Sequence, residues 1–210
     1  MHLDMNSFSS DILLHFKKVD PIVFELLSKM PPRQLGKGLL PDQYFGRLCE
    51  DIVGQQLSVK AADVITRRFI AGIGGVITPE IILDAVDQDL RNLGLSWAKV
   101  KYVKDLAHHT KEGNLKFDAF KDLSNDEIMS ELIKVKGIGP WTAEMFLIFT
   151  LGRPDVYSLG DLGLKNAFMK LYAVEDPKEY LIKAPEIVEK WSPYRSFGSL
   201  ALWYSLDNET

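Results

Sequence analysis

The residues that could do chemistry gather between positions 132 and 165, in the stretch LIKVKGIGPWTAEMFLIFTLGRPDVYSLGDLGLK. A turn with two glycines, Gly137 and Gly139, is followed by Pro140 and an apolar helical segment. Glycine permits the torsions of a sharp reversal, and proline suits the first position of a helix. The free N–H groups and the dipole at a helix start can bind a phosphate. We therefore expect a turn-and-helix phosphate site here.

Asp161 is the acidic residue of this stretch that draws attention. It follows Gly160 at the start of a predicted helix, a position where aspartate is a common cap. Judged on the residues alone, a capping role is the better interpretation. Asp155, six residues earlier, is the near competitor, but it follows Pro154 and is expected to serve a turn.

Helical signals surround this stretch. Residues 9–30 predict two short helices broken at Asp20-Pro21. Ser58 and Ser96 are expected to cap two further helices, and Ser124 with Glu127 has the spacing of a capping box. The tail predicts helices near 161–172 and 195–206, with prolines 177 and 185 dividing the segment between them. No strand alternation of any length is present, so the predicted fold class is all-α.

The composition is that of an ordinary globular protein. The 210 residues are 46% hydrophobic and 26% charged, with no run of about 18 apolar residues and no secretion signal. We therefore expect a cytoplasmic, nucleoid-associated protein with no membrane partner. Cys49 is the only cysteine, which rules out an intramolecular disulfide and a four-cysteine iron–sulfur cluster.

The formal net charge of −4 does not by itself indicate a nucleic-acid binder. Two local basic clusters, at positions 67–68 and 99–104, are best interpreted as solvated helix faces. Lys134 and Lys136 flank the glycine turn, and their position favours contact with DNA phosphates.

The segments Gly137-Ile-Gly-Pro-Trp-Thr-Ala143 and Gly160-Asp-Leu-Gly-Leu164 resemble the helix-hairpin-helix DNA glycosylases, specifically the monofunctional 3-methyladenine glycosylase II branch. The resemblance extends from about residue 42 to 206. It implies two helical subdomains with a DNA-binding cleft: residues 1–40 plus 161–210 in one, and 41–160 in the other, with the helix-hairpin-helix at about 126–151. The extra N-terminal β-rich domain of some bacterial members is expected to be absent.

The resemblance implies that Asp161 is the essential carboxylate. Breaking an N-glycosidic bond develops positive charge on the sugar, and a preorganised carboxylate stabilises it. Trp141 stands where bifunctional relatives carry a lysine that forms a Schiff base with the sugar. Indole cannot form one, so base removal without strand cleavage is implied. Taken alone, Trp141 would be interpreted as a core tryptophan.

A base pocket is implied at Trp141, Met145 and Trp203. Trp203 matches a tryptophan that flanks the excised base, although an aromatic residue in a C-terminal amphipathic helix is most often part of the core. Met145 replaces a pocket tyrosine of the best-known bacterial enzymes. It offers less aromatic surface, which puts the substrate range and the affinity for cationic bases in question.

The remaining contacts implied by the resemblance concern DNA. The loop Gln55, Gln56, Leu57 and Ser58 resembles the minor-groove loop, in which Gln56 would fill the gap left by the flipped nucleotide; a plain interhelical loop is the alternative. Further contacts are expected from Lys134, Lys136, Gly137, Gly139 and Thr142. The carbonyls of Ile133, Val135 and Ile138 match positions that can hold Na⁺ or K⁺, and no other cofactor is expected.

The predicted function is a monomeric hydrolase that flips alkylated purines, 3-methyladenine and 7-methylguanine, from duplex DNA and hydrolyses their glycosidic bonds in base excision repair. The alternative is a non-enzymatic helix-hairpin-helix protein that binds damaged DNA. A carboxylate near phosphates has no use in a pure binder, which favours the enzyme. A bifunctional glycosylase for oxidised bases is disfavoured by Trp141.

Overall fold

The computed structural model describes residues 8–31, 35–36 and 38–208. Within them the chain forms helices and no strand, which confirms the all-α prediction. The elements are α1 (Ser10–Val19), α2 (Pro21–Lys29), α3 (Pro41–Gly54), α4 (Val59–Gly72), α5 (Pro79–Asp84), α6 (Asp87–Asn92), α7 (Trp97–Lys111), the 3₁₀-helix η1 (Phe117–Lys121), α8 (Asn125–Leu132), α9 (Pro140–Phe149), α10 (Leu162–Leu171), α11 (Pro177–Glu189) and α12 (Arg195–Asp207).

Helix starts follow the local chemistry of the sequence. Proline occupies the first position of α2, α3, α5, α9 and α11, where its missing N–H leaves no hydrogen bond unmade. The predicted caps are present: Ser58 accepts from the Ala61 N–H and Ser96 from the Lys99 N–H. The Ser124 and Glu127 pair forms the predicted capping box.

The prediction for Pro185 was wrong. This proline does not divide the tail but lies inside α11, which is continuous from Pro177 to Glu189. Proline removes one backbone hydrogen bond from a helix. Tyr180, Ala184 and Val188 are buried on one face of α11, and this packing holds the helix together across the lost bond.

The chain divides into two units, one formed by Met1–Lys37 with Leu147–Thr210 and the other by Gly38–Phe146; we call them the terminal and the central unit. The second limit lies inside α9, whereas the sequence placed it at residue 160. The reason is that α9 is apolar on most sides. Phe146 packs edge-on against Tyr44 and Phe120 in the central unit, while Phe149 packs against Trp203 in the terminal unit.

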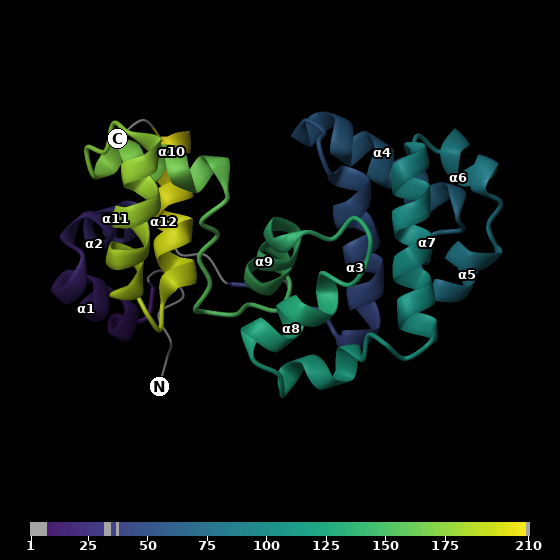
Figure 1. The fold of residues 1–210 in the computed structure, drawn as a ribbon, viewed down its shortest axis with the longest axis horizontal. Helices are drawn as coiled ribbons and strands as arrows, with labels where there is room; N and C mark the ends of the chain where they lie inside the picture. The colour runs from purple at the N-terminus through teal and green to yellow at the C-terminus, as the bar shows by residue number, and fades with distance from the viewer. Residues whose placement is uncertain (1–7, 32–34, 37, 209–210) are drawn as a thin grey trace. The chain divides into compact units, whose positions relative to one another are not determined.

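The terminal unit is built around α12, which packs against α10 and α2, with α1 and α11 completing the cluster (Figure 1). Trp191, just before α12, is fully buried. Its indole N–H donates to the buried carboxylate of Asp20 at 2.8 Å, and the Tyr172 hydroxyl donates to the same oxygen. Asp20 also caps α2, so this one side chain joins three segments of the unit.

In the central unit, α7 contacts α3 along one side and the short helices α5 and α6 along the other (Figure 1). The α3–α4 loop and the α8–α9 hairpin belong to this unit. Of the helices described, none has the length and apolar character needed to cross a membrane.

Candidate active site

The predicted hairpin is present, with α8 and α9 joined by the turn at 133–139. Gly137 has a φ of +88°, a conformation that side chains rarely adopt, and an added Cβ would lie 2.3 Å from the ring of Tyr102. Gly139 differs, because its φ is not in the left-handed region and an added Cβ would meet nothing within 4 Å. The sequence predicted that both glycines serve the reversal through torsions that other residues resist; in the structure only Gly137 has such a torsion.

Both lysines of the hairpin are exposed, and both contact carboxylates. Lys134 Nζ lies 2.7 Å from Glu131. Lys136 donates to Asp105 through its backbone N–H at 2.8 Å and through Nζ at 3.1 Å. Although burial raises it, these interactions with Lys136 hold the pKa of Asp105 below its ordinary value. Asp105 thus anchors the hairpin to α7.

The two glutamines of the α3–α4 loop have different environments. Gln55 Nε2 donates to the Gly137 carbonyl at 2.8 Å and to the Thr142 hydroxyl at 3.1 Å. Thr142 is buried, so this pair fastens the loop to the hairpin. Gln56 is exposed and has a φ of +57°, a strained conformation for a residue with a side chain. Leu57 beside it is also exposed.

Lys99 also holds the α3–α4 loop in place, through its backbone carbonyls. Its ammonium group donates to the carbonyls of Val53 and Gln55 at 2.8 and 2.7 Å, at the C-terminal end of α3. Burial lowers the pKa of Lys99. A lysine of this kind can act as a nucleophile, but these two hydrogen bonds make it a helix cap.

The three carbonyls considered for a cation lie on the hairpin turn. The Val135 carbonyl accepts the Ile138 N–H at 3.1 Å, which uses one of its two lone pairs. The side chains of Val135 and Ile138 are buried, and that of Ile133 is exposed. Cation binding by these three carbonyls stays a prediction.

Asp161 lies in the terminal unit, buried at the N-cap of α10. Its Oδ1 accepts the Leu164 N–H at 2.8 Å and the Trp203 indole N–H at 3.0 Å. The capping role expected from the residues alone is therefore confirmed. The same two donors fix the carboxylate in one orientation, which is what a preorganised electrostatic catalyst requires.

The surroundings of Asp161 are tightly packed. A Cβ added to Gly163 would lie 3.1 Å from Asp161 Oδ1 and 3.2 Å from the Trp203 ring, so glycine is required for this approach. The Tyr157 and Tyr180 hydroxyls lie 3.3 Å apart. Burial is the main cause that raises the pKa of both phenols, and the negative charge of Asp161 is a lesser cause. They therefore stay protonated near the carboxylate.

Trp203 is partly buried in α12, and its ring lies 5.4 Å from that of Phe149 at an interplanar angle of 34°. The structure adds a contact that the sequence did not predict, since the indole N–H orients Asp161. Asp155, the competing carboxylate, is bound by Arg195 through Nε at 2.7 Å and Nη2 at 3.0 Å and by the Ser192 hydroxyl. It anchors the start of α12.

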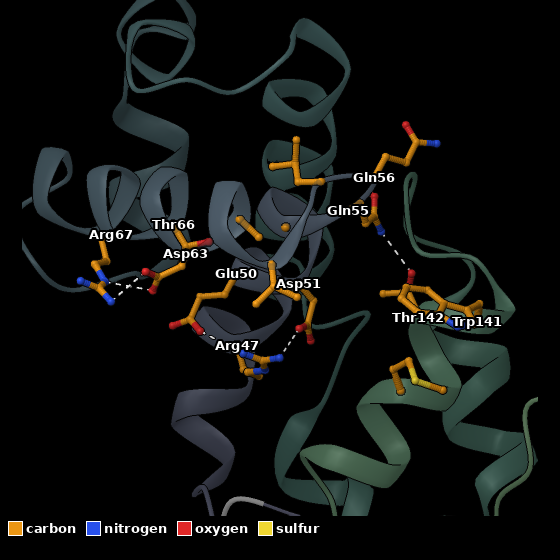
Figure 2. Close-up of a pocket in the computed structure, with 15 residues that line it drawn as sticks. Arg47, Glu50, Asp51, Gln55, Gln56, Asp63, Thr66, Arg67, Trp141 and Thr142 are labelled. Carbon is orange, nitrogen blue, oxygen red and sulfur yellow. Dashed lines mark hydrogen bonds and ion pairs between the residues drawn. The ribbon is translucent and has the colours of Figure 1, made fainter. Parts of the chain in front are cut away.

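Trp141 and Met145 line a cavity of about 600 Å³ in the central unit, formed by α3, the α3–α4 loop, α4 and the start of α9 (Figure 2). Trp141 is 46% exposed, so it is not a core residue. The other lining residues are Arg47, Glu50, Asp51, Gly54, Gln55, Gln56, Leu57, Val59, Ala62, Asp63, Thr66, Arg67 and Thr142.

Comparison with known proteins identifies this arrangement. Residues 49–193, which include the hairpin, Asp161 and Trp141, match the model of the HhH-GPD superfamily of base excision DNA repair proteins. The chain belongs to this superfamily.

Several relatives and solved structures from the superfamily are similar over most of the chain. DNA-3-methyladenine glycosylase 1 of Schizosaccharomyces pombe is 35% identical, over 76% of this chain and 71% of its own length. The crystal structure of a DNA-3-methyladenine glycosidase from Bacillus halodurans has a TM-score of 0.82 at 33% identity, covering 95% of this chain and 90% of that one. A 3-methyladenine DNA glycosylase of S. pombe in complex with abasic DNA has a TM-score of 0.78 at 30% identity, covering 94% and 97%.

The sequence alone did not identify some site residues of this HhH-GPD protein. Arg47 pairs with Glu50 and Asp51, and the spacing of three and four residues on one helix was a readable signal for these ion pairs. What the spacing could not indicate is that they line the cavity beside Trp141. Gly163 lay inside the motif that carries the resemblance, but its need for glycine depends on Trp203, forty residues later.

Proposed function

We propose that this chain is a monofunctional DNA glycosylase that acts as a monomer on duplex DNA and releases alkylated purines, 3-methyladenine and 7-methylguanine. Membership of the HhH-GPD superfamily supports the reaction class, and the names of the relatives support the substrate class. The observation that carries the proposal is the buried carboxylate of Asp161, oriented by the Leu164 and Trp203 N–H groups.

In this mechanism Asp161 acts as an electrostatic stabiliser. As the bond between base and sugar breaks, the sugar becomes an oxocarbenium-like cation, and a fixed negative charge beside it lowers the barrier. Alkylation at N3 of adenine or N7 of guanine already gives the base a positive charge and makes it a good leaving group. The carboxylate then orients the water that completes hydrolysis.

The cavity lined by Trp141 and Met145 is the proposed base pocket of the central unit. An exposed indole offers a stacking face for a flat purine, and a cationic purine adds a cation–π attraction of about 0.5–2 kcal/mol. We propose that Trp203 also flanks the base, in addition to orienting Asp161. Met145 provides adaptable apolar surface rather than a second aromatic face.

The central unit supplies the proposed DNA contacts. Gln56 is exposed at the tip of the α3–α4 loop and would fill the space left by the flipped nucleotide, flanked by Leu57 and Ser58. The turn at Gly137 and Gly139 would bring a phosphate to the start of α9, with Lys134 and Lys136 nearby. Gln55 and Thr142 bind each other, so we expect them to shape this surface from within.

Strand cleavage is not part of the proposed reaction. Trp141 has no amine, and the amines of Lys134 and Lys136 are engaged by the carboxylates of Glu131 and Asp105. Borohydride should trap no covalent adduct between the protein and an abasic duplex. A strong adduct would show that a lysine reaches the sugar and would overturn the monofunctional assignment.

The decisive test of the glycosylase is Asp161→Asn, assayed by chromatography of the bases released from alkylated duplex DNA. We expect release to fall by at least about a hundredfold, the effect of losing one electrostatic stabiliser. Binding to the same duplex should persist, because the substitution removes a charge that repels phosphates. If the wild-type protein binds lesion DNA but releases no base, the chain is a damage binder instead.

We also propose that Na⁺ or K⁺ binds the carbonyls of Ile133, Val135 and Ile138 and bridges the hairpin to a DNA phosphate. Duplex binding should then be weaker when the salt is changed to tetramethylammonium at equal ionic strength. Equal duplex binding in sodium, potassium and tetramethylammonium salts would contradict a cation at this interface.

A further inference from the structure

Tyr180 is a fully buried residue of α11 whose hydroxyl reaches the segment that leads to Asp161. This hydroxyl lies 3.0 Å from the Leu159 carbonyl and 3.3 Å from the Tyr157 hydroxyl. A carbonyl only accepts and a phenol has one proton, so Tyr180 donates to Leu159 and Tyr157 donates to Tyr180. The two hydrogen bonds form a chain that ends on the backbone two residues before Asp161.

The backbone that carries Asp161 is a tight turn. The Asp161 N–H donates to the Ser158 carbonyl at 3.1 Å, so residues 158–161 form a four-residue turn with Leu159 and Gly160 at its centre. Such turns have two common forms, which differ in the direction of the central peptide, and the second form needs a positive φ at the third residue. Gly160 does not have a positive φ here, but glycine accepts one without steric cost. The residues of the turn therefore do not by themselves exclude the second form.

The carbonyl that Tyr180 binds belongs to the peptide that would rotate. Rotation into the second form would turn the Leu159 carbonyl away from the Tyr180 hydroxyl and break their hydrogen bond. The Tyr180 ring is held against α10, because it packs edge-on against Phe168 at 5.5 Å and the ammonium group of Lys165 lies 5.9 Å from its centroid. A buried donor that loses its partner costs free energy. The hydroxyl therefore selects one form of the turn.

We propose that Tyr180 is a positioning residue for the glycosylase reaction, and that its hydroxyl holds the central peptide of this turn in the form that directs Asp161 for catalysis. The proposal rests on the role assigned to Asp161 above. The Leu164 and Trp203 N–H groups fix the carboxylate itself, and Tyr180 fixes the backbone from which the side chain extends. A carboxylate that stabilises a developing charge has to be in place before the bond breaks, so both attachments contribute to the rate.

The test uses Tyr180→Phe, which keeps the buried ring and removes only the hydroxyl. Tyr172→Phe is the matched control, because the Tyr172 hydroxyl is also a hydrogen-bond donor in the terminal unit but binds Asp20. Its lost bond goes to a carboxylate and should cost at least as much stability. Single-turnover base release from alkylated duplex DNA, duplex affinity and the thermal unfolding midpoint are measured for the wild-type protein and both variants.

We expect base release to fall about tenfold in Tyr180→Phe, with unchanged duplex affinity. This loss lies between that of one neutral hydrogen bond and the roughly hundredfold loss from a displacement of about 1 Å at a reacting group. Tyr172→Phe should lower the unfolding midpoint and leave the rate of release unchanged. An unchanged rate in Tyr180→Phe, or an equal fall in both variants, would overturn the proposal.

A measurement without DNA separates this proposal from the glycosylase assignment. The Trp203 indole N–H donates to Asp161, and the Trp191 indole N–H donates to Asp20, so the hydrogen exchange of each, followed by NMR, reports on one carboxylate. Tyr180→Phe should speed exchange at Trp203 and not at Trp191, and the control variant should do the reverse. Unchanged exchange at Trp203 in Tyr180→Phe would contradict the proposal. If the expected pattern appears but the wild-type protein releases no base, the positioning role holds and the glycosylase assignment fails.

A second substitution tests the turn itself. Alanine at position 160 disfavours the positive φ that the second form needs, and its methyl would meet no other atom within 4 Å. Gly160→Ala should therefore restore slow exchange of the Trp203 indole N–H when it is combined with Tyr180→Phe. Fast exchange in the double variant would show that Tyr180 does not act through this peptide, and would overturn the proposal.

Discussion

Alanine substitutions at the two glycines of the hairpin should affect different properties: protein stability at Gly137 and DNA affinity at Gly139. At Gly137 an alanine would adopt a φ of +88°, and its Cβ would lie 2.3 Å from Tyr102 Cγ and 2.9 Å from Tyr102 Cβ. These atoms are close to the Tyr102 backbone, so the ring cannot swing aside. At Gly139 the added methyl would meet nothing, and the torsion is an ordinary one.

The expected magnitudes follow from these contacts. For Gly137→Ala, the left-handed torsion costs about 1–2 kcal/mol and the overpacking about 1–3 kcal/mol. At roughly 2–4 °C per kcal/mol for a chain of this size, the unfolding midpoint should fall by roughly 10 °C. Gly139→Ala should cost less than about 1 kcal/mol, the scale of a changed cap. Its methyl would occupy the space offered to a phosphate, and DNA affinity should fall about tenfold, or about 1.4 kcal/mol.

Thermal unfolding and fluorescence anisotropy with an abasic duplex measure the two quantities on the same preparations. The expected pattern is a loss of stability for Gly137→Ala, and a loss of affinity with near-normal stability for Gly139→Ala. Wild-type affinity in Gly139→Ala would refute the phosphate approach to this turn. Wild-type stability in Gly137→Ala would refute the steric argument.

Three further predictions concern the terminal unit. Gly163→Ala should reduce base release at least about tenfold with little change in DNA binding, because its methyl displaces Asp161 or Trp203. Trp203→Phe keeps a ring but removes the indole donor, so the rate of base release should fall while the protein stays folded; an unchanged rate would show that this hydrogen bond does not matter. Burial raises the pKa of Asp155, but hydrogen bonds from Arg195 and Ser192 outweigh it and the net shift is downward. The ionised Asp155 carboxylate therefore stabilises the folded protein at pH values above its unfolded-state pKa, and this stabilisation is lost as the pH falls through its lower folded-state pKa. Denaturant titrations should show that the difference in unfolding free energy between wild type and Asp155→Asn shrinks below about pH 4.

The sequence by itself determined the fold class and most helix starts. Two of these signals act within a single turn of helix: a proline at the first helical position, and a serine whose side chain accepts the N–H of the residue three positions later. No distant part of the chain is needed to predict them. The capping box at Ser124 and the cap at Asp161 are of this kind. The motif around Gly137 and Asp161 also indicated the family, because the residues proposed to take part in the reaction lie in a short stretch of sequence.

Only the tertiary structure decided which partner each site residue has. Asp161 is oriented by Trp203, which lies 42 positions later, and Gln55 is bound to Thr142, 87 positions later. Likewise, Gly137 must be glycine because Tyr102 on another helix packs against it, while Gly139 faces open space. Such contacts depend on how helices pack, and helix packing is set by the summed burial of many apolar side chains rather than by any local pattern.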